Sequence, residues 1–103
     1  MTSSGKERAA LRAEAHHLSP LVHVGHQGFS PTLVATLDDA LRTRELVKVQ
    51  LANTLEQKPK VAATELAERT GAEVIQVIGR TATFYRFNPE LERRKGAEPP
   101  WRR

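Results

Sequence analysis

Residues 21–34 carry the sequence LVHVGHQGFSPTLV, which decides the fold because a strand, a turn and a helix start follow one another in it. The β-branched run at 21–24 predicts a short strand that ends at Gly25. Ser30 can cap the next helix, and Pro31 suits its first position, where the missing N–H costs nothing. The buried stripe of this helix is expected at apolar residues with helical spacing: Leu33 or Val34, Leu37 and Leu41.

The same patterns extend outward to both ends of the chain. The other predicted elements are a helix at 6–18, a strand at 46–51, a helix from Pro59 to Gly71, and strands at 73–78 and 81–87 joined by a turn at Gly79-Arg80. Strands separated by helices are expected to run parallel, and the last pair must be antiparallel. The fold class is therefore α/β, in the order α-β-α-β-α-β-β, with a small four-stranded mixed sheet. The sequence does not decide which helices cover which face.

Length and composition favour one domain. The chain has 103 residues, too few for two independent cores. We expect a flexible N-terminus at 1–5, a folded domain at 6–88 and a basic flexible tail at 89–103. The chain has no cysteine, which excludes disulfides and thiolate metal sites. No apolar run is long enough for a membrane span or a signal peptide, so a cytoplasmic protein without a membrane partner is expected.

The charge balance favours a polyanionic partner. Sixteen Lys and Arg oppose twelve Asp and Glu, for a formal net charge of +4. About three of these four net charges fall in residues 86–103, so a binding surface on the folded part depends on where its cations are placed.

No catalytic or metal-binding pattern is found, and no enzyme activity, cofactor or small-molecule substrate is expected. Four histidines lie close together in the sequence, but without the spacing of a metal site: His16, His17, His23 and His26. The chain also lacks a nucleophile elbow, a phosphate-binding loop and paired carboxylates.

The G-x-x-G segment Gly25-His26-Gln27-Gly28 is the most informative feature. Two residues without a Cβ allow the backbone to approach a phosphate, and the start of the next helix offers free N–H donors. RNA-binding KH domains clamp nucleotides with such a loop. A tight turn that merely requires glycine is the alternative.

Several cations occupy positions expected to be exposed and are candidates for RNA backbone contacts: Lys48, Arg80, Arg86 and Arg12. Each of them can equally be a solubilising charge. Phe84 and Tyr85 fall on opposite faces of the last strand, so one of them could stack on a base, although burial of both is favoured.

Five ordered segments resemble the signatures of the CRM domain in its bacterial single-domain form, the YhbY-like RNA-binding proteins. These segments are residues 15–20 (AHHLSP), 22–28 (VHVGHQG), 44–49 (RELVKV), 76–80 (QVIGR) and Tyr85-Arg86. The resemblance runs from about Arg8 to Phe87, which is nearly all of the predicted folded part.

The resemblance implies a fold similar to the C-terminal domain of translation initiation factor three. It also implies RNA binding and association with pre-ribosomal particles, through large-subunit ribosomal RNA or its precursor, during ribosome assembly. Residue by residue, Gly25, His26, Gln27 and Gly28 match the family loop, and Lys48 and Arg80 match basic positions of the family. His26 and Gln27 carry no fixed charge, so the loop is expected to contribute backbone donors and fit.

Two other functions stay open at this point. The chain could be a protein-interaction adaptor of the translation or ribosome-assembly machinery, without direct RNA contact. It could also bind DNA, because backbone contacts alone do not distinguish the two nucleic acids; the 2′-hydroxyl does.

Overall fold

The computed structural model describes residues 4–90 of the chain. Residues 1–3 of the predicted N-terminal segment and 91–103 of the predicted basic tail lie outside the described residues. The elements follow the predicted order: α1 (Gly5–Ala15), β1 (Val22–Val24), α2 (Pro31–Arg44), β2 (Leu46–Leu51), α3 (Pro59–Thr70), β3 (Glu73–Ile78) and β4 (Thr81–Tyr85). Among residues 4–90, no helix is long and apolar enough to cross a bilayer.

The first helix begins at Gly5 and ends at Ala15, earlier at both ends than expected. The Ser4 hydroxyl accepts the Glu7 N–H at 3.1 Å, and the Glu7 carboxylate accepts the Ser4 N–H at 3.1 Å. This reciprocal capping satisfies N–H groups that the first turn would otherwise leave unpaired. Ser4 and Gly5 therefore belong to the folded domain, whereas the sequence placed them in the flexible N-terminus.

The ends of the other two helices agree with the sequence analysis. The Ser30 hydroxyl accepts the Leu33 N–H at 3.1 Å, and Pro31 is the first residue of α2. Gly71 follows α3 with φ of 68°, the left-handed conformation that glycine adopts without a steric cost. These ends depend on short-range chemistry, which explains why the sequence located them.

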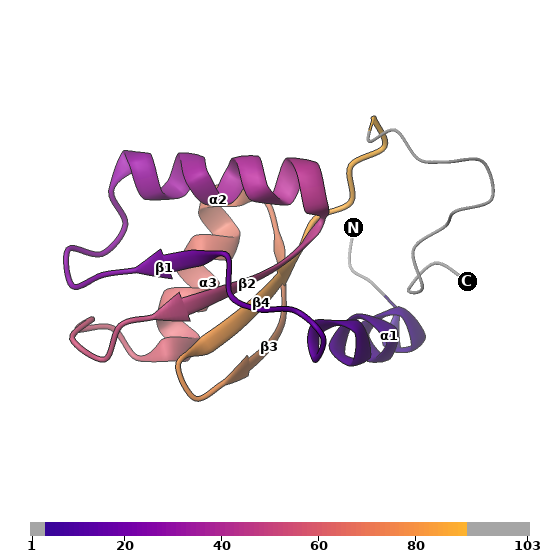
Figure 1. Ribbon diagram of the computed structural model, residues 1–103, viewed down its shortest axis with the longest axis horizontal. Coiled ribbons are helices and arrows are strands. Elements are labelled where there is room, and N and C mark those ends of the chain that lie inside the picture. The colour runs from indigo at the N-terminus through magenta and orange to yellow at the C-terminus, as the bar shows by residue number, and fades with distance from the viewer. Residues whose placement is uncertain (1–3, 91–103) are drawn as a thin grey trace.

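The sheet is mixed, with strand order β1-β2-β4-β3 (Figure 1). β1 and β2 run parallel, and β4 is antiparallel to both of its neighbours. β1, β2 and β3 therefore point the same way, as predicted. However, β2 and β3 do not pair, because the hairpin after β3 returns the chain between them.

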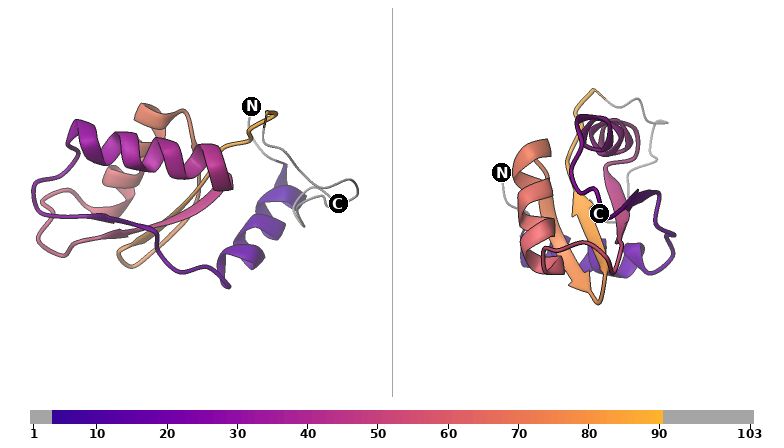
Figure 2. Two further views of the ribbon diagram at one scale, coloured as in Figure 1. Left: turned by 45° about the horizontal axis from the view of Figure 1, so that its top comes forward. Right: turned by 90° about the vertical axis from the view of Figure 1, so that its left-hand side faces the viewer.

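The two faces of the sheet carry separate cores. α2 and α3 pack on one face, where their apolar side chains meet Val47, Val49 and Phe84. α1 packs on the other face, where Leu11 and Ala15 meet Leu46, Ile75 and Tyr85. Figure 2 shows α1 set toward one end of the sheet, away from the loop that joins β1 to α2. Helix α1 therefore leaves the other half of its face without a helix over it.

A bulge in β3 adapts this edge strand to α1. The register of β3 against β4 shifts between Val74 and Gln76, and Ile75 becomes buried with α1. The Arg8 guanidinium donates to the Val74 carbonyl at 2.9 Å and to the Glu73 carboxylate at 2.9 Å. Arg8 thus covers backbone acceptors at this end of the edge strand, which limits pairing with another chain.

Candidate nucleic-acid interface

The G-x-x-G segment forms a tight, exposed turn between β1 and α2. The Gly28 N–H donates to the Gly25 carbonyl at 3.0 Å, which closes the turn. Gly28 has φ of 77°, where a residue with a Cβ is strained. The backbone conformation of the turn therefore requires glycine at position 28.

Gly25 is not required in the same way. Its φ lies outside the left-handed region, and a Cβ built on it would meet no heavy atom within 4 Å. The fold would accept alanine here, so the missing side chain leaves free space beside the backbone. Within the described residues, the N–H groups of His26 and Gln27 have no hydrogen-bond partner. The turn therefore combines unpaired donors with open space at the Cα of Gly25.

The N-terminus of α2 follows this turn after two residues and offers one further donor. Pro31 has no N–H, and the Thr32 N–H has no partner within residues 4–90. The positive end of the helix dipole lies at this point. Together, the turn and the helix start can bind an anion such as a phosphate.

Arg80 is the predicted cation that the tertiary structure brings to this end of the sheet. Its Nη1 donates to the Ala52 carbonyl at 3.1 Å, and its own carbonyl accepts the Leu51 N–H at 2.7 Å. The Ala52 N–H in turn donates to the Val24 carbonyl at 2.9 Å, at the end of β1. Ala52 therefore links the β3–β4 turn to the strand that leads into the G-x-x-G segment.

Lys48 lies on the α1 face of β2, as the alternation predicted. Its Nζ donates to the Ala15 carbonyl at 3.1 Å, at the C-terminus of α1. A lysine ammonium has three N–H donors, so further donors remain. Lys48 also lines a cleft of about 470 Å³ with Glu14, His17 and Arg44. Lys48 therefore contacts the end of α1, whereas Arg80 contacts the loop that follows β2.

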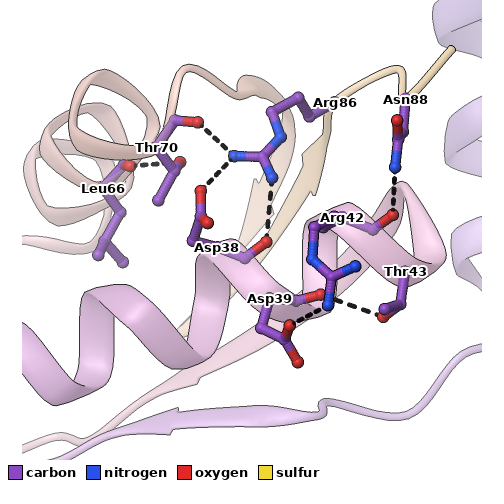
Figure 3. A network of polar contacts seen from close by, with 8 residues as sticks. All are labelled: Asp38, Asp39, Arg42, Thr43, Leu66, Thr70, Arg86 and Asn88. Atoms are coloured by element: carbon purple, nitrogen blue, oxygen red, sulfur yellow. Dashed lines mark hydrogen bonds and ion pairs between the residues drawn. The ribbon is translucent and has the colours of Figure 1, made fainter. Parts of the chain in front are cut away.

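Arg86 is not near the G-x-x-G turn. Its Nη1 donates to Asp38 Oδ1 at 2.6 Å and to the Thr70 carbonyl at 2.7 Å, and its Nη2 donates to the Asp38 carbonyl at 3.0 Å (Figure 3). The guanidinium thus joins α2 to α3 at the opposite end of β2 from Arg80, because β4 runs antiparallel to β2. Three hydrogen bonds of its guanidinium therefore serve the fold.

Arg12 is also separate from the turn, since it lies in the last turn of α1, at the other end of the sheet (Figure 1). The exposed end of α2 holds a further cation, Arg42, whose pKa is raised by a hydrogen bond and the charge of Asp39 (Figure 3). Of the four basic residues predicted to contact RNA, the structure places only Arg80 beside the glycine-containing turn.

The aromatic residues of β4 are both core residues. Phe84 is fully buried on the face of α2 and α3, and Tyr85 is buried on the face of α1. Neither ring is available for stacking on a base. All four histidines are exposed, and residues 4–90 hold no group of three or more potential metal-binding side chains.

Gln50 and Thr81 were not among the residues predicted from the sequence to bind RNA. The alternation of apolar and polar residues along each strand predicts that both side chains face outward. They carry no charge, however, and positive charge was the property that indicated RNA contacts. The pairing register places them side by side, and the Thr81 hydroxyl donates to Gln50 Oε1 at 3.2 Å. Only the assembled sheet reveals this neighbourhood.

Several known proteins are similar to this chain in sequence or in fold. Residues 4–86 match the family described as the CRS1 / YhbY (CRM) domain. The "Probable RNA-binding protein YqeI" of Bacillus subtilis is 32% identical over 87 residues, covering 84% of this chain and 91% of the relative. An "RNA-binding protein" of Haemophilus influenzae is 32% identical over 91 residues, covering 88% and 92%. The solution structure of SAV1595 from Staphylococcus aureus superposes with a TM-score of 0.75 at 33% identity, covering 88% of this chain and 95% of that one.

Proposed function

The chain belongs to the CRS1 / YhbY (CRM) domain family, and we propose that it binds RNA by holding the phosphate backbone at the turn of residues 25–28. The observation that carries this proposal is the combination of unpaired N–H groups at His26 and Gln27 with open space at Gly25. Arg80 supplies a cation at the same end of the sheet. The names of the relatives, which describe RNA-binding proteins, support the choice of RNA as the polyanion.

We further propose that the RNA belongs to precursors of the large ribosomal subunit, and that the protein assists ribosome assembly. Support for this step is the resemblance to YhbY-like proteins in the order of the sequence segments. The chemistry required of the protein is recognition and not catalysis. No catalytic role, cofactor or small-molecule substrate forms part of the proposal.

Fluorescence anisotropy with a labelled fragment of large-subunit ribosomal RNA tests the binding site. Phosphate contacts predict that log affinity falls linearly with log salt between roughly 50 and 200 mM. The Gly28→Asp variant should lose binding because it places a carboxylate beside the phosphate. Gly28→Asn is the matched control, since asparagine has a side chain of the same shape as aspartate and a similar tolerance of positive φ, without the charge. Equal RNA affinity of the two folded variants would refute the assignment of the turn.

Crosslinking in cells followed by sequencing of the attached RNA tests the ribosomal part of the proposal. Enrichment of large-subunit precursor RNA is the expected result. Enrichment of other transcripts would support the proposal that the protein binds RNA and would contradict the proposal that it assists ribosome assembly. A pull-down of protein partners that survives nuclease and about half-molar salt, with no crosslinked RNA, would favour the adaptor function, because this salt screens most phosphate attraction.

A further inference from the structure

One half of the α1 face of the sheet carries a transverse row of side chains, with one residue from each strand. His23 pairs with Gln50, Gln50 with Thr81, and Thr81 with Ile78. We call His23, Gln50, Thr81 and Ile78 the outer row. It lies at the end of the sheet where β1 leads into the G-x-x-G turn, whereas α1 covers Leu46, Ile75 and Tyr85 on the other half of this face.

The outer row is accessible and contains no carboxylate. His23 is exposed, Gln50 and Thr81 are partly exposed, and Ile78 is 60% exposed, the highest value among the large apolar residues of the described chain. The next row toward α1 consists of Lys48, Thr83 and Gln76, also without an acidic group. This half of the face therefore offers neutral polar groups, one apolar contact and a neighbouring cation.

The polar groups of the outer row have a defined arrangement. The Thr81 hydroxyl donates to Gln50 Oε1 at 3.2 Å, which holds the Gln50 amide in place. The amide N–H groups of Gln50 have no partner within residues 4–90. A fixed amide with free donors is suited to the carbonyl and ring-nitrogen acceptors of a nucleobase, as in other protein contacts with bases.

We propose that the outer row contacts the bases of single-stranded RNA whose backbone is held at the turn of residues 25–28; this inference rests on the proposed function. Val24 alone separates His23 from Gly25, so the two sites are roughly 7 Å apart along the strand. A short run of nucleotides can reach both. The row crosses four strands, roughly 14 Å in total, and four-stranded sheets of other RNA-binding domains hold two or three bases.

The side chains of the outer row are better suited to unpaired RNA than to duplex RNA or to a protein partner. In an RNA duplex the Watson–Crick edges are paired and the major groove is too deep and narrow for side chains to read. The shallow minor groove is recognised mostly by shape and through 2′-hydroxyl and phosphate contacts, so side-chain contacts to base edges would gain little there. A protein partner would require a larger apolar area at the centre of its interface than the single Ile78 side chain supplies. Splayed, unstacked bases match both the hydrogen-bonding groups and the one apolar contact.

The double variant Gln50→Ala/Ile78→Ala tests this inference by anisotropy with short single-stranded RNAs and a matched RNA duplex. We expect about a tenfold loss of single-strand affinity, since base contacts of this kind account for such factors. The salt dependence should keep its slope, because neutral side chains release no counterions. Duplex affinity should not change. Thr36→Ala/Val61→Ala, on exposed positions of α2 and α3, is the matched control and should bind like the unmodified protein.

The outcomes separate this inference from the proposed function. If Gln50→Ala/Ile78→Ala binds single-stranded RNA with unchanged affinity while Gly28→Asp binds it more weakly, the outer row does not contact the bases. The proposal that the turn is the RNA site would then stand. An equal loss for single-stranded and duplex RNA would also overturn the base contacts. If the unmodified protein binds neither RNA, both proposals fail. The Gln50→Met variant keeps the length of the side chain without its amide and adds no charge, and its expected loss of single-strand affinity checks that the effect does not arise from lost packing.

Discussion

Arg86 and Asp38 lie 48 positions apart in the sequence, yet Arg86 Nη1 donates to Asp38 Oδ1 at 2.6 Å. The same guanidinium nitrogen donates to the Thr70 carbonyl at 2.7 Å, so one side chain joins α2, α3 and the end of β4. The Arg86 side chain is only 23% exposed, whereas that of Asp38 is 54% exposed, so solvent weakens the ion pair itself and the hydrogen bond to the Thr70 carbonyl is the better shielded contact. Arg86 therefore stabilises the fold at the end of β2 opposite Arg80.

Arg86→Ala should lower the stability of the fold without changing the RNA site. The loss of hydrogen bonds to a partly buried charged group predicts a cost of about 1–3 kcal/mol. Thermal melting followed by circular dichroism should show the midpoint lowered by roughly 4–8 °C per kcal/mol in a domain of this size. If the variant keeps its melting temperature but binds RNA with a smaller salt dependence, the original prediction that Arg86 contacts RNA is correct.

Gly25→Ala should separate folding from binding. The added Cβ meets no atom within 4 Å, so the native conformation accepts it. Alanine also reduces the entropy of the unfolded chain, and stability should stay the same or rise by about 0.4–1 kcal/mol. RNA affinity should fall, because the methyl group occupies the space beside the backbone donors. Urea unfolding and anisotropy on the same sample test this, and full RNA affinity would show that the space at Gly25 is not used.

Arg80→Ala should reduce the salt dependence of RNA binding by about one unit of slope, as expected for one lost phosphate contact. Arg12→Ala is the comparison, because Arg12 lies on α1 at the other end of the sheet (Figure 1). Its slope should equal that of the unmodified protein. Titrations at several salt concentrations give both slopes, and a smaller slope for Arg12→Ala would extend the RNA surface to α1.

Glu45 is a fully buried acidic residue with φ of 65°, an uncommon conformation for a residue other than glycine. Its Oε2 accepts the Asn88 N–H at 2.7 Å and so holds the chain after β4. Glu45→Ala leaves that N–H without this acceptor, which predicts a loss of about 1–3 kcal/mol. Glu45→Gln keeps an acceptor of the same shape and should cost less. Urea unfolding ranks the two variants, and equal losses would show that the hydrogen bond to Asn88 is unimportant.

Much of the fold was predictable because it depends on neighbouring residues. Ser30 and Pro31 start α2, and Gly71 ends α3, through contacts within a single turn of chain. The alternation in residues 46–51 correctly separated the buried Val47 and Val49 from Lys48. The end of β4 was not predictable in this way, since the contacts of Arg86 and Asn88 with α2 end it before Phe87.

The candidate site also combines features that depend on neighbouring residues with features that depend on residues far apart in the chain. The sequence by itself determined the order of the elements and the presence of an exposed turn with glycines at 25 and 28, because periodicity, caps and turn residues act over a few positions. Only the tertiary structure decided that α1 covers one half of a sheet face and that Gln50 lies between His23 and Thr81. It also decided that Arg80 lies at the end of the sheet that carries the turn, whereas Arg86 lies at the other end. The physical reason is that β4 inserts between β2 and β3, and such pairing depends on contacts between residues far apart in the chain.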